Sequence, residues 1–295
     1  MRDSIGIGSA ALTRFLAAAG LAQFSRCPRL LALAAGTMIC LTAVWPGSAH
    51  AQEDAAWGHM VIIGASVSHG FTESQVGPKM TDYALDRYVN AALLAPHEPA
   101  RNLAAVEFFL SPDEIGIMQI RQALTNRPTL VVGVDFLFWF CYGKGNTDQD
   151  RLDHFEKGLK LLEGVECPLI IGDIPDASAA ANGILSPDEL PSPAVRIAAN
   201  RRLKEWAAQH KQVTVVPLAE FMRAASANEA ISVHGHVIAR GTTGALLQED
   251  RLHPSRRGCA VLAVSIFDTF LAGHPGSDAM QVRWDPDEVL QAAGR

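Results

Sequence analysis

Two short segments near opposite ends of the chain carry side chains that could perform acyl transfer together. Asp250 and His253 stand three residues apart in Asp-Arg-Leu-His-Pro-Ser, a spacing that can place both side chains on one turn. Ser66 stands in Gly-Ala-Ser-Val-Ser, directly after an apolar run. Gly64 permits a tight turn there, so the Ser66 hydroxyl can project from it. These residue types supply a nucleophile, its base and an orienting acid.

Each segment alone has an ordinary structural explanation. A Ser after a strand is usually a turn or cap residue, and a His before a helix is usually a loop residue with a capping neighbour. The combination is what favours chemistry. Asp250 can accept a hydrogen bond from one ring nitrogen of His253 and leave the other nitrogen as a general base.

The elements that must position these residues follow from apolar runs that alternate with amphipathic segments. Continuous apolar runs are typical of strands buried on both faces, as in a parallel sheet. Strands are expected at His59–Ile63, Leu103–Phe109, Thr129–Asp135, Pro168–Ile171 and Val213–Val216. Helices are expected from Ser111 to Leu124 and over Arg151–Leu162, Ala194–His210 and Arg257–Leu271, the first opened by the capping box Ser111-Pro-Asp-Glu.

This order of elements predicts an α/β protein, a three-layer α/β/α sandwich with a mainly parallel, flavodoxin-like five-stranded sheet. Ligands of such sheets bind at the carboxyl ends of the strands. Ser66, Asp135 and Asp173 fall at those ends. The aromatic run 136–140 is a candidate to line a pocket there, with core packing as the alternative for part of it, and 172–176 is a candidate for the rim.

The N-terminal region has the pattern of a secretory signal peptide. Arg26 and Arg29 precede an apolar run over 30–44, and the alanines at 49 and 51 fit a cleavage site, so 1–51 is predicted to be removed. An uncleaved anchor is the alternative, but the run is shorter than the roughly 20 residues that span a bilayer. The predicted location is therefore periplasmic or extracellular, with no stable membrane span after cleavage.

The remaining chain is expected to form one domain. Residues 52–57 would be a short leader of the mature chain, 58–273 the domain, and 274–295 a tail with one short helix. The chain has 295 residues, of which 48% are hydrophobic and 19% charged, so it can bury a sizeable core.

Charge and cysteine content exclude several functions. Residues 1–51 hold four of the 25 basic and one of the 31 acidic residues, so the mature chain has a net charge of −9. This charge argues against binding nucleic acid or an anionic membrane. Cys141, Cys167 and Cys259 allow one disulfide but do not assign it. No CxxC or HExxH motif is present, so no metal site is expected.

Together, the two segments resemble the blocks of the SGNH (GDSL-type) hydrolases, over about residues 58–273. The family's Gly-Asp-Ser-Leu-Ser is similar to Gly64-Ala-Ser-Val-Ser68, and its Asp-x-x-His-Pro is similar to Asp250-Arg-Leu-His-Pro254. Their order and spacing also agree with the family. The resemblance implies that Ser66 is the nucleophile, His253 the general base and Asp250 the residue that orients it, with no metal or organic cofactor.

The chain departs from the family's pattern at the oxyanion hole. The family's third block, Gly-x-Asn-Asp, supplies an Asn side chain, whereas the matching Gly133-Val-Asp135 has an Asp. An ionised Asp135 would repel an oxyanion, and a protonated one could donate to it. Alternatively, Asp135 faces elsewhere and binds a substrate hydroxyl or loop N–H groups. The family's Gly after the second strand has no clear counterpart. Gly64, Gly133 and Asp135 are the oxyanion or substrate candidates.

The resemblance implies an exported serine esterase that cleaves a small carboxylic ester through an acyl-enzyme. An acetylated glycan, a short-chain ester and a lysophospholipid are the candidate substrates, and no nucleic acid is expected as a partner. An acyltransferase to a sugar hydroxyl would use the same residues. A non-catalytic binding domain is a third alternative, because the oxyanion positions are altered.

Overall fold

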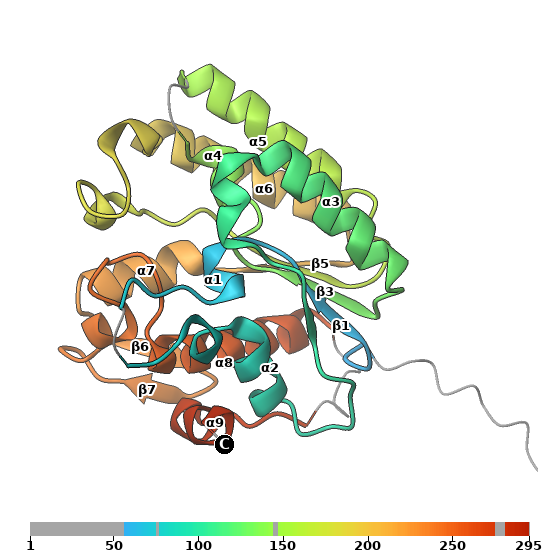
Figure 1. Ribbon diagram of the computed structural model, residues 1–295, viewed down its shortest axis with the longest axis vertical. Coiled ribbons are helices and arrows are strands. Elements are labelled where there is room, and N and C mark those ends of the chain that lie inside the picture. The colour runs from blue at the N-terminus through green and yellow to red at the C-terminus, as the bar shows by residue number, and fades with distance from the viewer. Residues whose placement is uncertain (1–55, 75–76, 144–146, 275–280, 295) are drawn as a thin grey trace, which may run out of the picture. The chain divides into compact units, whose positions relative to one another are not determined.

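A five-stranded parallel sheet forms the middle layer of the computed structural model, which describes residues 56–74, 77–143, 147–274 and 281–294 (Figure 1). The strand order is β2-β1-β3-β4-β5, the flavodoxin-like order that the sequence predicts. The strands are β1 (Met60–Ile62), β2 (Arg101–Asn102), β3 (Leu130–Gly133), β4 (Leu169–Gly172) and β5 (Val213–Val216). The predicted signal peptide, 1–51, lies outside the described residues and stays a prediction.

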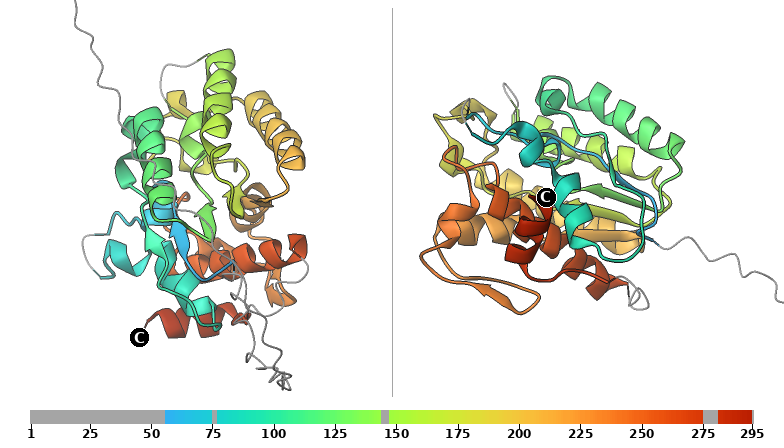
Figure 2. Two further views of the ribbon diagram at one scale, coloured as in Figure 1. Left: turned by 90° about the vertical axis from the view of Figure 1, so that its right-hand side faces the viewer. Right: turned by 60° about the horizontal axis from the view of Figure 1, so that its bottom comes forward.

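Helices cover both faces of the sheet (Figures 1 and 2). One face carries α3 (Pro112–Thr125), α4 (Phe138–Cys141), α5 (Asp148–Leu162) and α6 (Pro193–Gln209), and the other carries α2 (Leu85–Ala92), α8 (Arg256–Gly273) and α9 (Pro286–Ala293). Two further helices follow strands directly, α1 (Ser66–His69) after β1 and α7 (Leu218–Ser226) after β5. The smaller elements are the hairpin β6 (Ile231–Val233) and β7 (His236–Ile238), and the 3₁₀ turns η1 (Met80–Asp82), η2 (Val106–Leu110), η3 (Ser178–Ala180), η4 (Pro187–Glu189) and η5 (Thr243–Leu246).

Side-chain caps explain where the long helices begin. Thr147 accepts from the N–H of Asp150 at the start of α5, and Ser255 accepts from the N–H of Gly258 at the start of α8. Helix α3 begins as predicted, at the Pro after Ser111, but the Ser111 side chain makes no capping hydrogen bond. The predicted capping box is therefore wrong there, and the proline at the first helical position accounts for this start.

The predicted strand Leu103–Phe109 is wrong. Strand β2 is only Arg101–Asn102, which pairs with β1 at the edge of the sheet, and the chain then turns into η2. Phe108 is fully buried, whereas the side chains at 109 and 110 are 46% and 67% exposed. This apolar run therefore forms a 3₁₀ turn with one side buried, and it does not form a strand with both faces buried.

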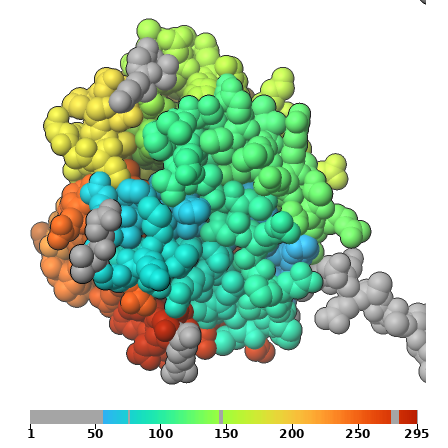
Figure 3. Space-filling model, in the orientation of Figure 1, coloured from blue at the N-terminus to red at the C-terminus, as the bar shows by residue number. Residues whose placement is uncertain are grey.

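Residues 281–294 are part of the same sandwich. Helix α9 packs against α2 and α8, and Val282 forms an antiparallel bridge with Leu93. On the face drawn in Figure 3, residues that follow β1 (cyan) meet the C-terminal third of the chain (orange and red). Distant parts of the sequence therefore share one surface.

Two further findings concern the described part of the chain. Cys141, Cys167 and Cys259 are all free thiols, so none of the three forms a disulfide with another. No helix within the described ranges has the length and apolar character needed to cross a membrane.

Candidate active site

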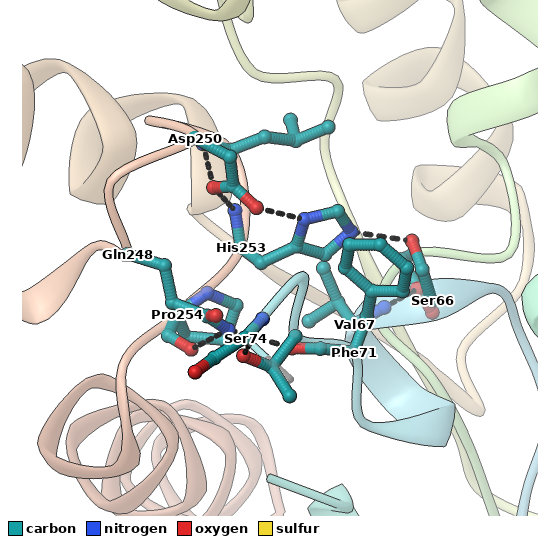
Figure 4. Close-up of polar contacts among 11 residues, drawn as sticks. Ser66, Val67, Phe71, Ser74, Gln248, Asp250, His253 and Pro254 are labelled. Atoms are coloured by element: carbon teal, nitrogen blue, oxygen red, sulfur yellow. Dashed lines mark hydrogen bonds and ion pairs between the residues drawn. The ribbon is translucent and has the colours of Figure 1, made fainter. Parts of the chain in front are cut away.

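Ser66, His253 and Asp250 form one hydrogen-bonded chain (Figure 4). Ser66 Oγ lies 2.8 Å from His253 Nε2, and His253 Nδ1 lies 2.7 Å from Asp250 Oδ2. Ser66 begins α1 at the carboxyl end of β1, whereas Asp250 and His253 come from the loop before α8. With its proton on Nδ1, the imidazole leaves Nε2 free to accept the Ser66 hydroxyl proton.

Asp250 holds both the imidazole and the backbone of its own loop. Its Oδ1 accepts from the N–H groups of Leu252 and His253, both at 2.9 Å. Burial raises the pKa of the Asp250 carboxyl, but the hydrogen bond and charge of His253 and these N–H groups outweigh burial, so the pKa lies below its ordinary value. Asp250 is therefore ionised near neutral pH. The turn also needs Arg251 at φ 59°, a conformation that side chains other than Gly seldom adopt.

Phe71 and Gln248 hold the other side of the imidazole. The Phe71 ring lies against that of His253, with 4.4 Å between ring centroids (Figure 4). Gln248 Nε2 donates to the carbonyls of Phe71 at 2.6 Å and Pro254 at 3.0 Å, which ties the loop after α1 to the histidine loop. His253 is 2% exposed as a result. The sequence did not indicate either contact, because no local pattern links residues so far apart.

The turn before Ser66 is fixed by Gln119, a buried side chain of α3. Its amide forms two hydrogen bonds with Gly64, from the Gly64 N–H to Oε1 at 2.8 Å and from Nε2 to the Gly64 carbonyl at 2.9 Å. The Gly64 N–H is therefore not free to bind an oxyanion, contrary to its place among the predicted candidates. The sequence did not single out Gln119. The signal that could have found it is its place on the face of α3 that is buried, because a buried polar side chain needs a hydrogen-bond partner.

Neither of the two glycines could carry a side chain. Gly64 has φ 137°, and a Cβ there would lie 2.1 Å from Asp135 Oδ1. Gly133 lies within β3, where a Cβ would lie 2.9 Å from Ile63 Cγ1. Gly133 pairs with Ile171 of β4, so the structure places it in the sheet, where it serves close packing.

Asp135 faces the first turn of α1, the geometry of the loop N–H alternative. Its Oδ2 accepts from the N–H groups of Val67 at 2.8 Å and Ser68 at 3.2 Å, and its Oδ1 accepts from Ser68 Oγ at 2.6 Å. Burial raises the pKa of the Asp135 carboxyl, while the Ser68 hydroxyl and the N–H groups of this turn oppose the rise. Asp135 thus caps the short helix that begins with Ser66.

Polar groups of β2 and of the segment after it also hold the start of α1. Asn102 Nδ2 donates to the Ser68 carbonyl at 2.9 Å and to Asp86 Oδ1 at 2.7 Å, so both amide hydrogens are used. The N–H of Ala105 donates to the Gly64 carbonyl at 3.1 Å. These contacts secure α1 from β2 and α2.

An apolar pocket opens beside Ser66, at the carboxyl ends of β3 and β4. Its lining is almost wholly hydrocarbon and includes Ala65, Val67, Val134, Asp135, Phe138, Trp139, Asp173, Ile174, Pro175, Leu218, Phe221, Met222, Leu247, Leu252, Pro254 and Leu262. Phe138 and Trp139 thus line a pocket, while Phe136 and Phe140 are fully buried core residues. Asp173 accepts from the N–H of Ala219 at 2.7 Å and so caps α7, and burial raises the pKa of its carboxyl.

The fold and the Ser–His–Asp chain define a parallel α/β sandwich with a candidate acyl-transfer site. No protein-family model matches the sequence, and no curated protein matches it. Solved structures are similar to it in fold. A lipase/acylhydrolase from Enterococcus faecalis has 18% identity and a TM-score of 0.47, covering 77% of this chain and 98% of that one.

Two more solved structures have similar values. TesA has 15% identity and a TM-score of 0.43, covering 73% of this chain and 99% of its own. LAE5, an alpha/beta hydrolase enzyme from the metagenome of Lake Arreo in Spain, has 16% identity and a TM-score of 0.42, covering 74% and 95%. All three structures are similar to this chain in fold alone. At such low identities they say nothing about the site, whose chemistry must come from this chain's own residues.

Substituting Gln119 tests whether α3 holds the turn before Ser66. Gln119→Leu removes both hydrogen bonds to the Gly64 peptide, which should lower the free energy of unfolding by about 3 kcal/mol. Any hydrolysis that depends on Ser66 should fall about 100-fold, because small displacements of a reacting group are costly. Thermal melts and kinetics measure the two effects. Gln122→Leu, on the exposed side of the same helix, is the matched control, and equal effects in both variants would contradict the assignment.

Proposed function

We propose that this protein is a serine hydrolase that cleaves carboxylic esters through an acyl-enzyme. The observation that carries the proposal is the hydrogen-bonded chain from Ser66 through His253 to Asp250, beside an apolar pocket. Ser66 Oγ attacks the acyl carbonyl while His253 Nε2 takes its proton and Asp250 stabilises the imidazolium. The imidazolium then protonates the leaving alcohol, and a water molecule activated by His253 releases the acid.

The backbone N–H of Ser66 is the group best placed to stabilise the oxyanion. It is the first N–H of α1, and such a group has no partner within its own helix. The next two N–H groups of the helix, those of Val67 and Ser68, donate to the Asp135 side chain and hold it against the helix. Asp135 in this arrangement positions the nucleophile's helix and is not itself the oxyanion donor.

The pocket favours an ester with an apolar acyl group. Its walls are aliphatic and aromatic side chains of the β3 and β4 ends, α7 and α8, which gain from burying hydrocarbon. An acetyl group would leave most of this surface unused. Among the candidate substrates, a short-chain ester or a lysophospholipid therefore fits better than an acetylated glycan. The predicted leader supports action in the periplasm or outside the cell.

A fluorophosphonate probe tests the nucleophile directly. The protein should be labelled covalently at Ser66, and Ser66→Ala should not be labelled at all, because the probe reacts with an activated serine hydroxyl. Intact-protein mass spectrometry measures the adduct. Absence of labelling of the wild-type protein from mildly acidic to mildly alkaline pH would refute the serine hydrolase and leave a non-catalytic binding domain. Hydrolysis of p-nitrophenyl esters then separates a hydrolase from a transferase, which needs an added alcohol to release the acyl group.

A further inference from the structure

A second pocket lies directly behind the one beside Ser66. It is formed by the end of β5, by α7, by β6 and by the middle of α8. Its lining includes Ile231, Val233, Ser265, Asp268 and Thr269. Leu218, Phe221 and Leu262 line both pockets, so these three side chains form a wall between them.

The wall is held in place from three sides. Leu218 packs against Gly172 so closely that a Cβ at Gly172 would lie 2.4 Å from Leu218 Cδ1. Asp173 caps α7 at the N–H of Ala219, which fixes the first turn of the helix that carries Leu218 and Phe221. Leu262 projects from α8 and is 3% exposed. Leu262 is therefore a core residue, whereas Leu218 and Phe221 are partly buried against that core.

The two pockets differ in chemistry. The pocket beside Ser66 is nearly all apolar, whereas the second is lined both by apolar residues such as Ile231 and Val233 and by polar residues such as Asp268 and Thr269. The wall therefore decides how much apolar surface an acyl chain can reach from Ser66.

We propose that Leu218, Phe221 and Leu262 set the longest acyl chain that the site accepts, by closing the Ser66 pocket against the second pocket. This inference rests on the proposed function and names its specificity-determining residues. Phe221 has the largest side chain of the wall and is only partly buried, so its truncation should join the two pockets without removing a fully buried core side chain.

Esterase kinetics with acyl chains of two lengths test the wall. The ratio of kcat/KM for p-nitrophenyl dodecanoate to that for the hexanoate should rise at least tenfold in Phe221→Ala, since each further methylene buried is worth roughly fourfold. Leu218→Ala should raise the same ratio and serves as a second variant, with thermal melts reporting on folding. An unchanged ratio in both folded variants would overturn the proposal.

Filling the second pocket gives the matched control. Ser265 lines only that pocket, so Ser265→Phe should leave the wild-type ratio as it is and abolish the gain when combined with Phe221→Ala. If the double variant kept the gain, the longer chain would lie elsewhere and the proposed role of the wall would be wrong.

Ligand binding separates this inference from the proposed function. Titration calorimetry with hexanoate and with dodecanoate, below its micelle concentration, should show a tenfold gain in dodecanoate affinity on going from Ser66→Ala to Ser66→Ala/Phe221→Ala. A wild-type protein without esterase activity would refute the hydrolase alone. Unchanged dodecanoate affinity would refute the wall, whether or not esters are cleaved.

Discussion

Asp250→Asn should lower kcat for ester hydrolysis about 10⁴-fold without loss of the fold, the size of effect expected when a triad acid becomes an amide. Asp250 uses both carboxylate oxygens, one for the His253 ring and one for the N–H groups of Leu252 and His253. An Asn has only one oxygen. If that oxygen stays on the backbone, the amide NH₂ faces His253 Nδ1 and forces the ring proton onto Nε2, where it blocks transfer from Ser66.

Steady-state kinetics and thermal melts over a range of pH check this expectation. Because the pKa of Asp250 is lowered in the folded protein, its ionised form contributes stability above the ordinary Asp range and loses it as pH falls through the lowered pKa. The Asn variant should lack that acid-side loss. An Asn variant with kcat within tenfold of wild type would mean that Asp250 does not set the tautomer of His253.

Substitutions of Asp135 by Ala and by Asn should have opposite effects on stability and activity. Asp135→Ala leaves the N–H groups of Val67 and Ser68 without their buried acceptor, so the free energy of unfolding should fall by about 3 kcal/mol. Hydrolysis should fall about 100-fold as α1 shifts. Asp135→Asn should keep the fold and most of the activity, because its oxygen can accept from both N–H groups and its NH₂ can donate to Ser68 Oγ.

The pH dependence of stability gives an independent test of Asp135. Burial raises the pKa of this carboxyl, so the folded state holds its proton more tightly than the unfolded state does. The stability that it contributes is present below its ordinary pKa and is lost as pH rises through the raised value. From about pH 4 upward, the melting temperature of Asp135→Asn should therefore rise relative to wild type. A constant difference across pH would contradict the raised pKa.

The sheet and most helices were predictable because their signals are local. Buried runs such as Leu130–Gly133 and the starts of α5 and α8 depend on short patterns of apolar and capping residues. The strand expected at Leu103–Phe109 failed for a physical reason. An apolar run can be buried by a turn at a sheet edge as well as by a central strand, and only tertiary packing separates the two cases.

The candidate site divides in the same way. The sequence predicted the Asp250–His253 pair from its spacing, because both residues lie on one turn. It also predicted the turn at Gly64, because this turn lies at the end of one strand. The contacts of Asp135 and Gln119 were not, since each crosses more than 50 residues to reach the turn around Ser66. Two alternatives for Asp135 were equally compatible with the sequence, and only the direction of its side chain distinguishes them.

The distance along the chain between Ser66 and its hydrogen-bond partner has a consequence for synthesis of the protein. His253 is made 187 residues after Ser66, which at typical translation rates means a delay of roughly 10–40 seconds. During that interval the Ser66 hydroxyl on the growing chain lacks its hydrogen-bond partner, His253. Any product of premature termination before α8 would likewise carry an unactivated serine. In the proposed hydrolase, activation of Ser66 is thereby coupled to synthesis of the loop before α8.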